Sequence, residues 1–263
     1  NKEELKKLLE ERNIEYKETD LMDFLILNKI KNIENLDLFK KGYFTVQDIS
    51  AGLTAIVLNP NPNDKVLDAC AAPGGKSVNA ALKVVESAYA NIKDIPDDGV
   101  EENIIKSITG RVISRDVSDY KVSLIDDNIE RLGISNIDVQ VYNALDKDDS
   151  LVGKADIVIA DLPCSGLGIM GRKPDIRYNI SPEKISDIIR LQRDILEVVS
   201  MYVKPGGTLV YSTCTINRSE NEDNADWICT SLGFTRDGEY VQMLPSPDKD
   251  NDGFFVARLI KIS

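Results

Sequence analysis

The chain has 263 residues, of which 42% are hydrophobic and 29% charged, enough for one large globular domain with a small appendage. No apolar run is long enough to span a bilayer, and the opening NKEELKKLLEE lacks the apolar core of a signal peptide. Four cysteines without a CxxC pair argue against a structural zinc site or a disulfide framework. We therefore expect a cytoplasmic protein, and the start at Asn1 rather than Met favours a piece of a longer chain.

The sequence contains no histidine, which narrows the possible chemistry. Ser-His-Asp triads, Cys-His pairs and HExxH metalloproteases are excluded, so any general base is a carboxylate, an amine, a phenol, a thiol or water. The net charge of −12 is also unfavourable for binding nucleic acid, whose affinity usually rests on Lys and Arg meeting phosphates.

The beginning of the chain precedes any regular pattern of strands and helices. It holds a charged helix predicted over 2–12 and short apolar stretches such as FLIL. We predict a small α+β subdomain over 1–45, followed by the main domain over 46–263. Within the main domain, the acidic segment 86–108 contains Pro and Gly and is predicted to be a solvated insertion.

Strands and helices alternate through the main domain. VLDACAAPGGKS (66–77) predicts a strand, a glycine-bearing loop and the start of a helix. The further predicted elements, in chain order, are a strand at 110–116, a helix at 122–133, strands at 137–143 and 155–164, a helix at 181–203, a turn at 204–207, a strand at 208–214, a helix at 219–233 and a closing strand within 252–262. This alternation is typical of a doubly wound, mostly parallel α/β sheet that binds ligands at the carboxyl ends of its strands.

The loop CAAPGGK (70–76) has small residues where a backbone must approach a ligand closely. It leads into a helix N-terminus, which favours an anionic group. Asp116 ends the next strand, the position from which an acidic side chain binds a ribose in nucleoside-cofactor folds. The alternative for the loop is a tight strand-to-helix turn without a ligand.

Two cysteines, Cys164 in DLPC and Cys214 in STC, each follow a strand of the same predicted sheet. Their side chains could converge on one crevice at the sheet edge. The alternative is that each is a small buried residue, which is the commoner fate of a lone cysteine. Cys70 and Cys229 are assigned to packing on that ground.

Four motifs carry a resemblance to a known family: DACAAPGGKS, ADLPCSGLGIMGRKPDIRYN, YSTCTINRSENED and DGFFVARLIK. Together they resemble the Sun-type RNA cytosine-C5 methyltransferases, over residue 44 to the C-terminus apart from 86–108. The bacterial small-subunit ribosomal RNA methyltransferase B group is the most similar. The resemblance implies a Rossmann-like class I methyltransferase fold, S-adenosylmethionine as cofactor and ribosomal RNA as substrate. Members usually carry an N-terminal NusB-like RNA-binding domain, which we do not expect within these 263 residues.

The resemblance also implies roles for individual residues. Cys214 would be the nucleophile that attacks carbon 6 of cytosine, and Cys164 would assist breakdown of the covalent adduct. Asp161 would stabilise the ring at N3 and the exocyclic amine, and Lys76 would lie nearby, although a solvent-exposed lysine at a helix start is the alternative. The cofactor-binding residues would be Cys70, Ala71, Ala72, Pro73, Gly74, Gly75, Lys76, Asp116, Asn143 and Asp161. Asn143 stands where the family usually has Asp.

The segment GRKPDIRYN offers Arg172, Lys173 and Arg177 for RNA phosphates and Tyr178 for stacking on a base. Its alternative is an ordinary mixed-charge loop. We expect a monomer without a metal or a membrane partner. Two other functions stay open: a DNA cytosine-C5 methyltransferase, in which the Pro-Cys cysteine is the nucleophile, and a catalytically silent, cofactor-binding RNA assembly factor.

Overall fold

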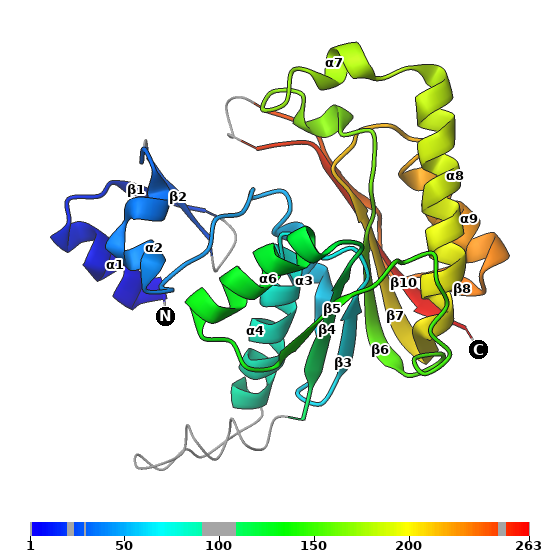
Figure 1. Ribbon diagram of the computed structural model, residues 1–263, viewed down its shortest axis with the longest axis horizontal. Helices are drawn as coiled ribbons and strands as arrows, with labels where there is room; N and C mark the ends of the chain where they lie inside the picture. Colours follow the sequence, from blue (N-terminus) through cyan, green and yellow to red (C-terminus); the bar gives the residue numbers. More distant parts are fainter. Residues whose placement is uncertain (1, 20–23, 29, 91–108, 247–250, 263) are drawn as a thin grey trace.

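The computed structural model describes residues 2–19, 24–28, 30–90, 109–246 and 251–262. Within them, an eight-stranded sheet has the order β5-β4-β3-β6-β7-β10-β8, with β9 also paired to β10 (Figure 1). The strands are β3 (Lys65–Asp68), β4 (Arg111–Asp116), β5 (Ile137–Val141), β6 (Ala155–Asp161), β7 (Val203–Thr213), β8 (Phe234–Arg236), β9 (Val241–Met243) and β10 (Phe254–Lys261). The first five pair in parallel and β10 runs antiparallel to β7, so the prediction of a mostly parallel α/β sheet is confirmed.

Helices cover both faces of this sheet (Figure 1). One face carries α3 (Leu53–Leu58), α4 (Gly75–Ala90) and α6 (Asp119–Leu132); the other carries α8 (Pro182–Val199) and α9 (Glu222–Ser231). A central strand therefore needs apolar side chains on both of its faces. In β6, Val158 and Ala160 join the cluster beneath α8, whereas Ile157 and Ile159 join the cluster beneath α4.

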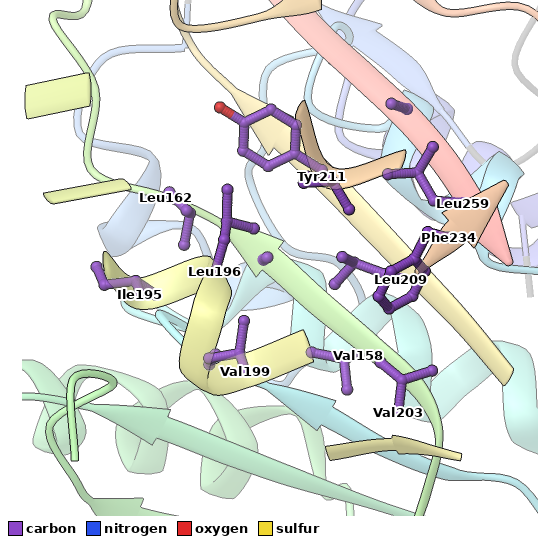
Figure 2. Close-up of a cluster of buried hydrophobic side chains, with 14 of the residues drawn as sticks. Val158, Leu162, Ile195, Leu196, Val199, Val203, Leu209, Tyr211, Phe234 and Leu259 are labelled. Carbon is purple, nitrogen blue, oxygen red and sulfur yellow. The ribbon is translucent and has the colours of Figure 1, made fainter. Parts of the chain in front are cut away.

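Figure 2 shows the cluster beneath α8, where Leu196 and Val199 of the helix meet Val158 of β6 and Leu209 of β7. All four side chains are fully buried. Burying a side chain of this size stabilises the fold by about 1.5–3 kcal/mol, so this layer fixes β6 and β7 beside each other. The two strands that lead to Cys164 and Cys214 are thereby held in one register.

The helix ends follow their sequence signals. Ser181 caps α8 by accepting a hydrogen bond from the Lys184 backbone, with Pro182 in the first turn. Gly133 ends α6 in the left-handed conformation at φ 66°. Both predicted helices are present, but the one predicted at 122–133 begins earlier, at Asp119. The one predicted at 181–203 ends at Val199 and is followed by a 3-10 turn, Ser200–Tyr202.

The N-terminal part forms a separate two-stranded sheet from β1 (Tyr16–Glu18) and β2 (Leu25–Leu27), with helices α1 (Lys2–Glu11) and α2 (Asp37–Lys40). Arg131 of α6 donates hydrogen bonds to the carbonyls of Phe39 and Phe44 and stacks on the Phe39 ring. A boundary at 45 stays a prediction. No helix within the described residues combines the length and hydrophobicity that a bilayer crossing needs.

Three details differ from the sequence predictions. The turn at 204–207 is a bulge inside β7, because Ala155 pairs with Val203 and Ile157 with Thr208. Gly206 makes this possible by adopting φ 74°. Strands β8 and β9 were not predicted, since each has three residues and shows no alternation. Residues 86–90 of the predicted insertion belong to α4, and 91–108 lie outside the described residues.

Candidate active site

The site lies at the edge of the sheet where four parallel strands end. Asp68 is level with Ile159 on β6, and Asp161 is level with Ser212 on β7. Because parallel neighbours end together, the loops after β3, β4, β6 and β7 meet at this edge. The residues singled out in the sequence are therefore brought together by the sheet and not by chain proximity.

The two cysteines face each other across this edge, with 3.1 Å between the Sγ atoms of Cys164 and Cys214. A hydrogen bond from the Cys164 thiol lowers the pKa of Cys214, and Lys76 adds to the lowering, whereas burial and the charge of Asp161 oppose it. The same contact, together with burial, raises the pKa of Cys164 well above its ordinary value. A lowered pKa favours the thiolate of Cys214, which is the form in which a cysteine acts as a nucleophile.

Lys76 and Asp161 form an ion pair beside the cysteines, with 2.7 Å between Nζ and Oδ2. Burial alone would lower the pKa of Lys76, but Asp161 and the nearby Asp68 raise it overall. Its side chain is only 14% exposed, so the alternative of a solvent-exposed helix-start lysine is wrong. Ser212 donates a second hydrogen bond to Asp161 at 2.8 Å, which fixes the carboxylate against β7.

The loop 70–76 is shaped by its backbone. Gly74 has φ 103°, and a Cβ there would lie 3.1 Å from Ile125 of α6, so only glycine fits without strain. The Ala71 N–H donates to the Arg115 carbonyl at 2.9 Å, which ties the loop to β4. Cys70 is largely shielded, and burial raises its thiol pKa, so it fits a packing role rather than a reactive one.

Asp68 lies at the root of this loop and is fully buried. Its Oδ2 accepts from Ser77 at 2.7 Å, whereas Oδ1 has no hydrogen-bond partner among the described residues. Burial raises the pKa of Asp68 to about 7. A buried, unsatisfied carboxyl oxygen beside a glycine loop fits a ligand that carries a donor, such as the amino group of an amino acid.

The two more distant cofactor candidates lie at the same edge. Asp116 is buried, and its oxygens accept from the backbone of Ala72 at 3.0 Å and of Val117 at 2.7 Å. Lys121 adds an ion pair at 3.0 Å. Asn143 follows the end of β5 by two residues, and its side chain accepts from the Leu145 backbone. Cofactor binding by either residue stays a prediction.

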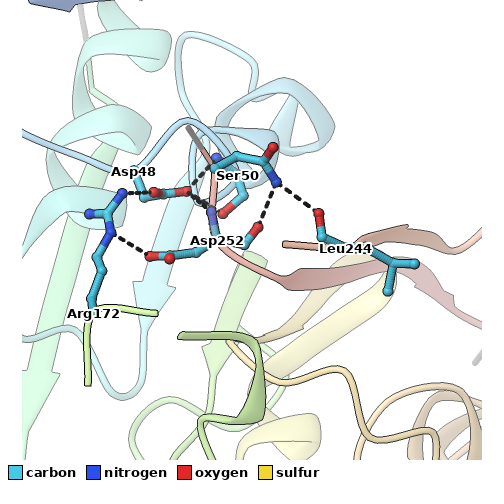
Figure 3. Close-up of polar contacts among 6 residues, drawn as sticks. Asp48, Ser50, Arg172, Leu244 and Asp252 are labelled. Atoms are coloured by element: carbon cyan, nitrogen blue, oxygen red, sulfur yellow. Dashed lines mark hydrogen bonds and ion pairs between the residues drawn. The ribbon is translucent and has the colours of Figure 1, made fainter. Parts of the chain in front are cut away.

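The loop 162–180 carries the four RNA-binding candidates. Arg172 is paired with Asp48 and Asp252, residues from two distant segments (Figure 3). Its charge is therefore already shared between two carboxylates. Lys173, Arg177 and Tyr178 are exposed near or within the short helix α7 (Ile176–Asn179), and Tyr178 is 82% exposed. RNA binding by all four stays a prediction.

The sequence analysis missed two residues at this site, Glu220 and Asn221, which it placed in the helix predicted at 219–233, whereas that helix begins at Glu222. Both are fully buried in the loop that precedes α9 and contact the two cysteine-bearing loops. The only sequence signal was their closeness to Cys214 in YSTCTINRSENED, because polar identity by itself indicates exposure.

The parallel sheet with antiparallel β10 beside β7, and the glycine loop at its carboxyl edge, define a Rossmann-like class I methyltransferase. Residues 103–260 match the family described as 16S rRNA methyltransferase RsmB/F, and the chain belongs to this family. The family resemblance that the sequence motifs indicated is thereby confirmed.

Individual relatives agree with this assignment. The chain is 34% identical over 211 residues to the probable ribosomal RNA small subunit methyltransferase B of Bacillus subtilis, covering 80% of this chain and 42% of that one. It is 32% identical to ribosomal RNA small subunit methyltransferase B of Salmonella paratyphi B, covering 97% and 56%. The chain thus spans about half the length of these curated relatives.

A solved structure gives the same answer for the fold. The crystal structure of NSun6 from Pyrococcus horikoshii with SFG superimposes with a TM-score of 0.72 and 27% identity. The match covers 93% of this chain and 62% of that one. The fold expected from the resemblance is therefore confirmed.

Proposed function

We propose that this chain transfers a methyl group from S-adenosylmethionine to carbon 5 of a cytosine in small-subunit ribosomal RNA. The observation that carries the proposal is the pair Cys164–Cys214, 3.1 Å apart, beside the Lys76–Asp161 ion pair. The relatives named ribosomal RNA small subunit methyltransferase B support the choice of RNA. A cytoplasmic setting agrees with free thiols at the site.

The residues at the sheet edge fit S-adenosylmethionine. The loop 70–76 would lie along its methionine end, Asp68 would accept from its amino group, and Asp116 would bind its ribose. Asn143 would lie nearer its adenine. When bound, this cofactor supplies an electrophilic methyl group on a sulfonium.

Carbon 5 of cytosine is too weak a nucleophile for such a methyl group until the ring is activated. The Cys214 thiolate adds to carbon 6, and the electrons of the C5–C6 double bond move into the ring, which makes carbon 5 nucleophilic. The lowered pKa of Cys214 favours the thiolate that this attack requires. Asp161 holds N3 and the exocyclic amine and stabilises the proton gained at N3.

Product release reverses the addition. The carbon-5 proton leaves to a base, its electron pair restores the C5–C6 double bond, and the bond from Cys214 to carbon 6 breaks. Cys164 is the group placed to assist this step, because its Sγ lies 3.1 Å from that of Cys214. The absence of histidine is no obstacle, since no step requires an imidazole.

The assignment of Cys214 as nucleophile also favours RNA over the DNA alternative. In DNA cytosine-C5 methyltransferases the Pro-Cys cysteine attacks, whereas this chain carries a second cysteine, Cys214 of the Thr-Cys motif, whose Sγ lies 3.1 Å from that of the Pro-Cys residue, Cys164. The target base must leave its stack to reach the buried edge, so a single-stranded or loop cytosine is the expected substrate.

The test is methyl transfer to stripped small-subunit ribosomal RNA, with products identified as nucleosides by mass spectrometry and titration calorimetry of S-adenosylmethionine alongside. We expect 5-methylcytosine with the wild-type chain and none with Cys214→Ala. Methylation at another atom would contradict the proposal. Cofactor binding without transfer to naked RNA or to an assembly intermediate would favour the silent assembly factor.

A further inference from the structure

The loop between β7 and α9 buries two consecutive polar side chains, Glu220 and Asn221, against the residues that flank the two cysteines. Neither has a place in the chemistry described above. Burying a carboxyl group costs free energy unless hydrogen bonds replace its water, and an apolar side chain of similar size would pack at lower cost. What the polar groups add is direction, because each hydrogen bond fixes the position of its partner.

Glu220 holds the loop that carries Cys164. Its oxygens accept from the Ser165 backbone at 2.8 Å, from the Ser165 hydroxyl at 2.6 Å and from Asn217 at 2.9 Å. Gln192 of α8 donates both to Glu220 at 3.2 Å and to the Pro163 carbonyl at 2.9 Å. The residues on either side of Cys164 are thus fixed by one connected group.

Asn221 does the same for Cys214. Its Oδ1 accepts from the Thr213 hydroxyl at 2.5 Å, and its Nδ2 donates to the Thr215 carbonyl at 3.0 Å. A further hydrogen bond to Gln242 of β9, at 2.7 Å, anchors Asn221 to the sheet. The residues on either side of Cys214 are therefore held by one amide.

The two groups meet at Thr215, whose Oγ1 lies 2.8 Å from Oγ of Ser165 and accepts from the Asn217 backbone at 3.3 Å. The contacts that hold the residues flanking each cysteine are nevertheless different, since Glu220 and Gln192 bind Pro163 and Ser165, whereas Asn221 binds Thr213 and Thr215. The 3.1 Å separation of the two sulfurs therefore depends on both sets of hydrogen bonds.

We propose that Glu220 and Asn221 are positioning residues with separate tasks: Glu220 places Cys164 for release of the adduct, and Asn221 places Cys214 for attack on carbon 6. The inference rests on the proposed function, since attack and release are its two covalent steps. A displacement of about 1 Å at a reacting group can cost on the order of 100-fold in rate, so loss of either support is measurable.

The experiment compares two pairs of variants in the full 263-residue chain. Glu220→Gln and Ser165→Ala weaken the Cys164 support from its two sides, and Asn221→Ala and Thr213→Val weaken the Cys214 support. Asp223→Asn is the matched control, because Asp223 is an exposed acid in the same segment whose ion pair with Arg218 contributes little. Thermal unfolding of each variant checks that it folds, and the serine and threonine variants keep the test open if Glu220→Gln or Asn221→Ala does not.

Adduct formation and release are followed separately with labelled RNA on denaturing gels. The Cys164-side variants should form the adduct at the wild-type rate yet accumulate it about 10-fold, and the Cys214-side variants should form it about 10–100-fold more slowly without accumulation. Asp223→Asn should behave as wild type. A parallel loss of both steps in all four variants, or no change in any, would overturn separate positioning.

A second measurement needs no RNA and separates this inference from the proposed function. Iodoacetamide alkylation of each cysteine is followed by mass spectrometry. The rate should change by about 3-fold or more for the cysteine whose support is weakened and stay constant for the other, since thiol reactivity follows its local environment. If the wild type fails to methylate cytosine, the proposed function fails, and this pattern alone still decides whether the supports act separately.

Discussion

The two loops that form the site differ in how they are held. The cofactor-side loop, 70–76, is short and fixed along its length by backbone contacts to β4 and by Gly74 packed on Ile125. The substrate-side loop, 162–180, is fixed at its root by Glu220 and at its middle by Arg172, and it ends in the exposed Tyr178.

This difference matches what each loop would bind under the proposed function. A small cofactor needs a cradle of constant shape, and a buried backbone provides that at little entropic cost. A long RNA needs a reacting group that is held rigidly at the root of the loop. Toward the outer end of the loop it needs exposed side chains, whose contacts add affinity and tolerate less accurate placement. We therefore expect substitutions at the root of the site to change the rate of methyl transfer, and substitutions at the outer end of the loop to change the affinity for RNA.

The largest expected effect is at the root of the site. Asp161→Asn removes the charge that pairs with Lys76, so kcat/KM should fall by about 100- to 1000-fold, the usual loss when an electrostatic group at a reacting centre is removed. Methyl transfer to RNA measures it. Asp156→Asn, at the other end of the same strand, should leave the rate within about 3-fold; equal losses in both variants would show a general effect of the strand.

Asp68 should make stability depend on pH. Burial raises its folded pKa to about 7, so the folded chain binds the proton more tightly than the unfolded chain. Its contribution to stability is present below pH 4 and is lost as pH rises through about 7, by an amount on the order of a few kcal/mol. Asp68→Asn should show a smaller fall in melting temperature between pH 5 and pH 8 than the wild type, as measured by calorimetry.

The control for this pH dependence is Asp223→Asn, which removes an exposed carboxylate and should leave the wild-type pH profile unchanged. Identical profiles for Asp68→Asn and the wild type would show that the carboxyl group is not strained by burial. Its role as an acceptor for the cofactor would then lose its structural support.

At the outer end of the substrate-side loop, Tyr178→Ala should weaken RNA binding by about 1–3 kcal/mol, the value of one base stacked on an aromatic ring. Tyr178→Phe keeps the ring and should bind as the wild type does. Binding to single-stranded RNA at fixed salt measures both. Cofactor affinity should be the same in all three proteins, and a change in it would remove the distinction between the two loops.

The smallest effects concern the cations of that loop. Lys173→Ala and Arg177→Ala should each reduce the slope of log affinity against log salt by about 0.7, as expected for one phosphate contact on a single strand. Arg172→Ala should change the slope less, because Asp48 and Asp252 already balance its charge. Its own signature is a loss of stability of about 1 kcal/mol or less. A decrease of about 0.7 in the salt slope for Arg172→Ala would instead show that Arg172 contacts a phosphate.

Much of the fold could be predicted because its signals are local. Alternating strands and helices, the Ser181 cap and the Gly133 terminus all depend on neighbouring residues. The candidate residues Lys76, Asp161, Cys164 and Cys214 could be placed together for a related reason, since parallel strand ends share an edge.

The rest depends on contacts that the sequence does not encode locally. Glu220 and Asn221 lie in a run of polar residues that looks exposed, and only the docking of α9 against β7 and α8 buries them. In the sequence Arg172 looks like a free cation, because the carboxylates that pair with it, Asp48 and Asp252, belong to segments distant in sequence (Figure 3). The bulge at 204–207 is visible only through the pairing of β7 with β6.

The central claim is that Cys214 attacks and Cys164 releases, and trapping the covalent intermediate tests it most directly. RNA incubated with S-adenosylmethionine and each single cysteine variant is run on a denaturing gel. Cys164→Ala should give a shifted protein–RNA band, because attack proceeds and release fails, and Cys214→Ala should give none. A shifted band from Cys214→Ala, with none from Cys164→Ala, would contradict the assignment of the two sulfurs.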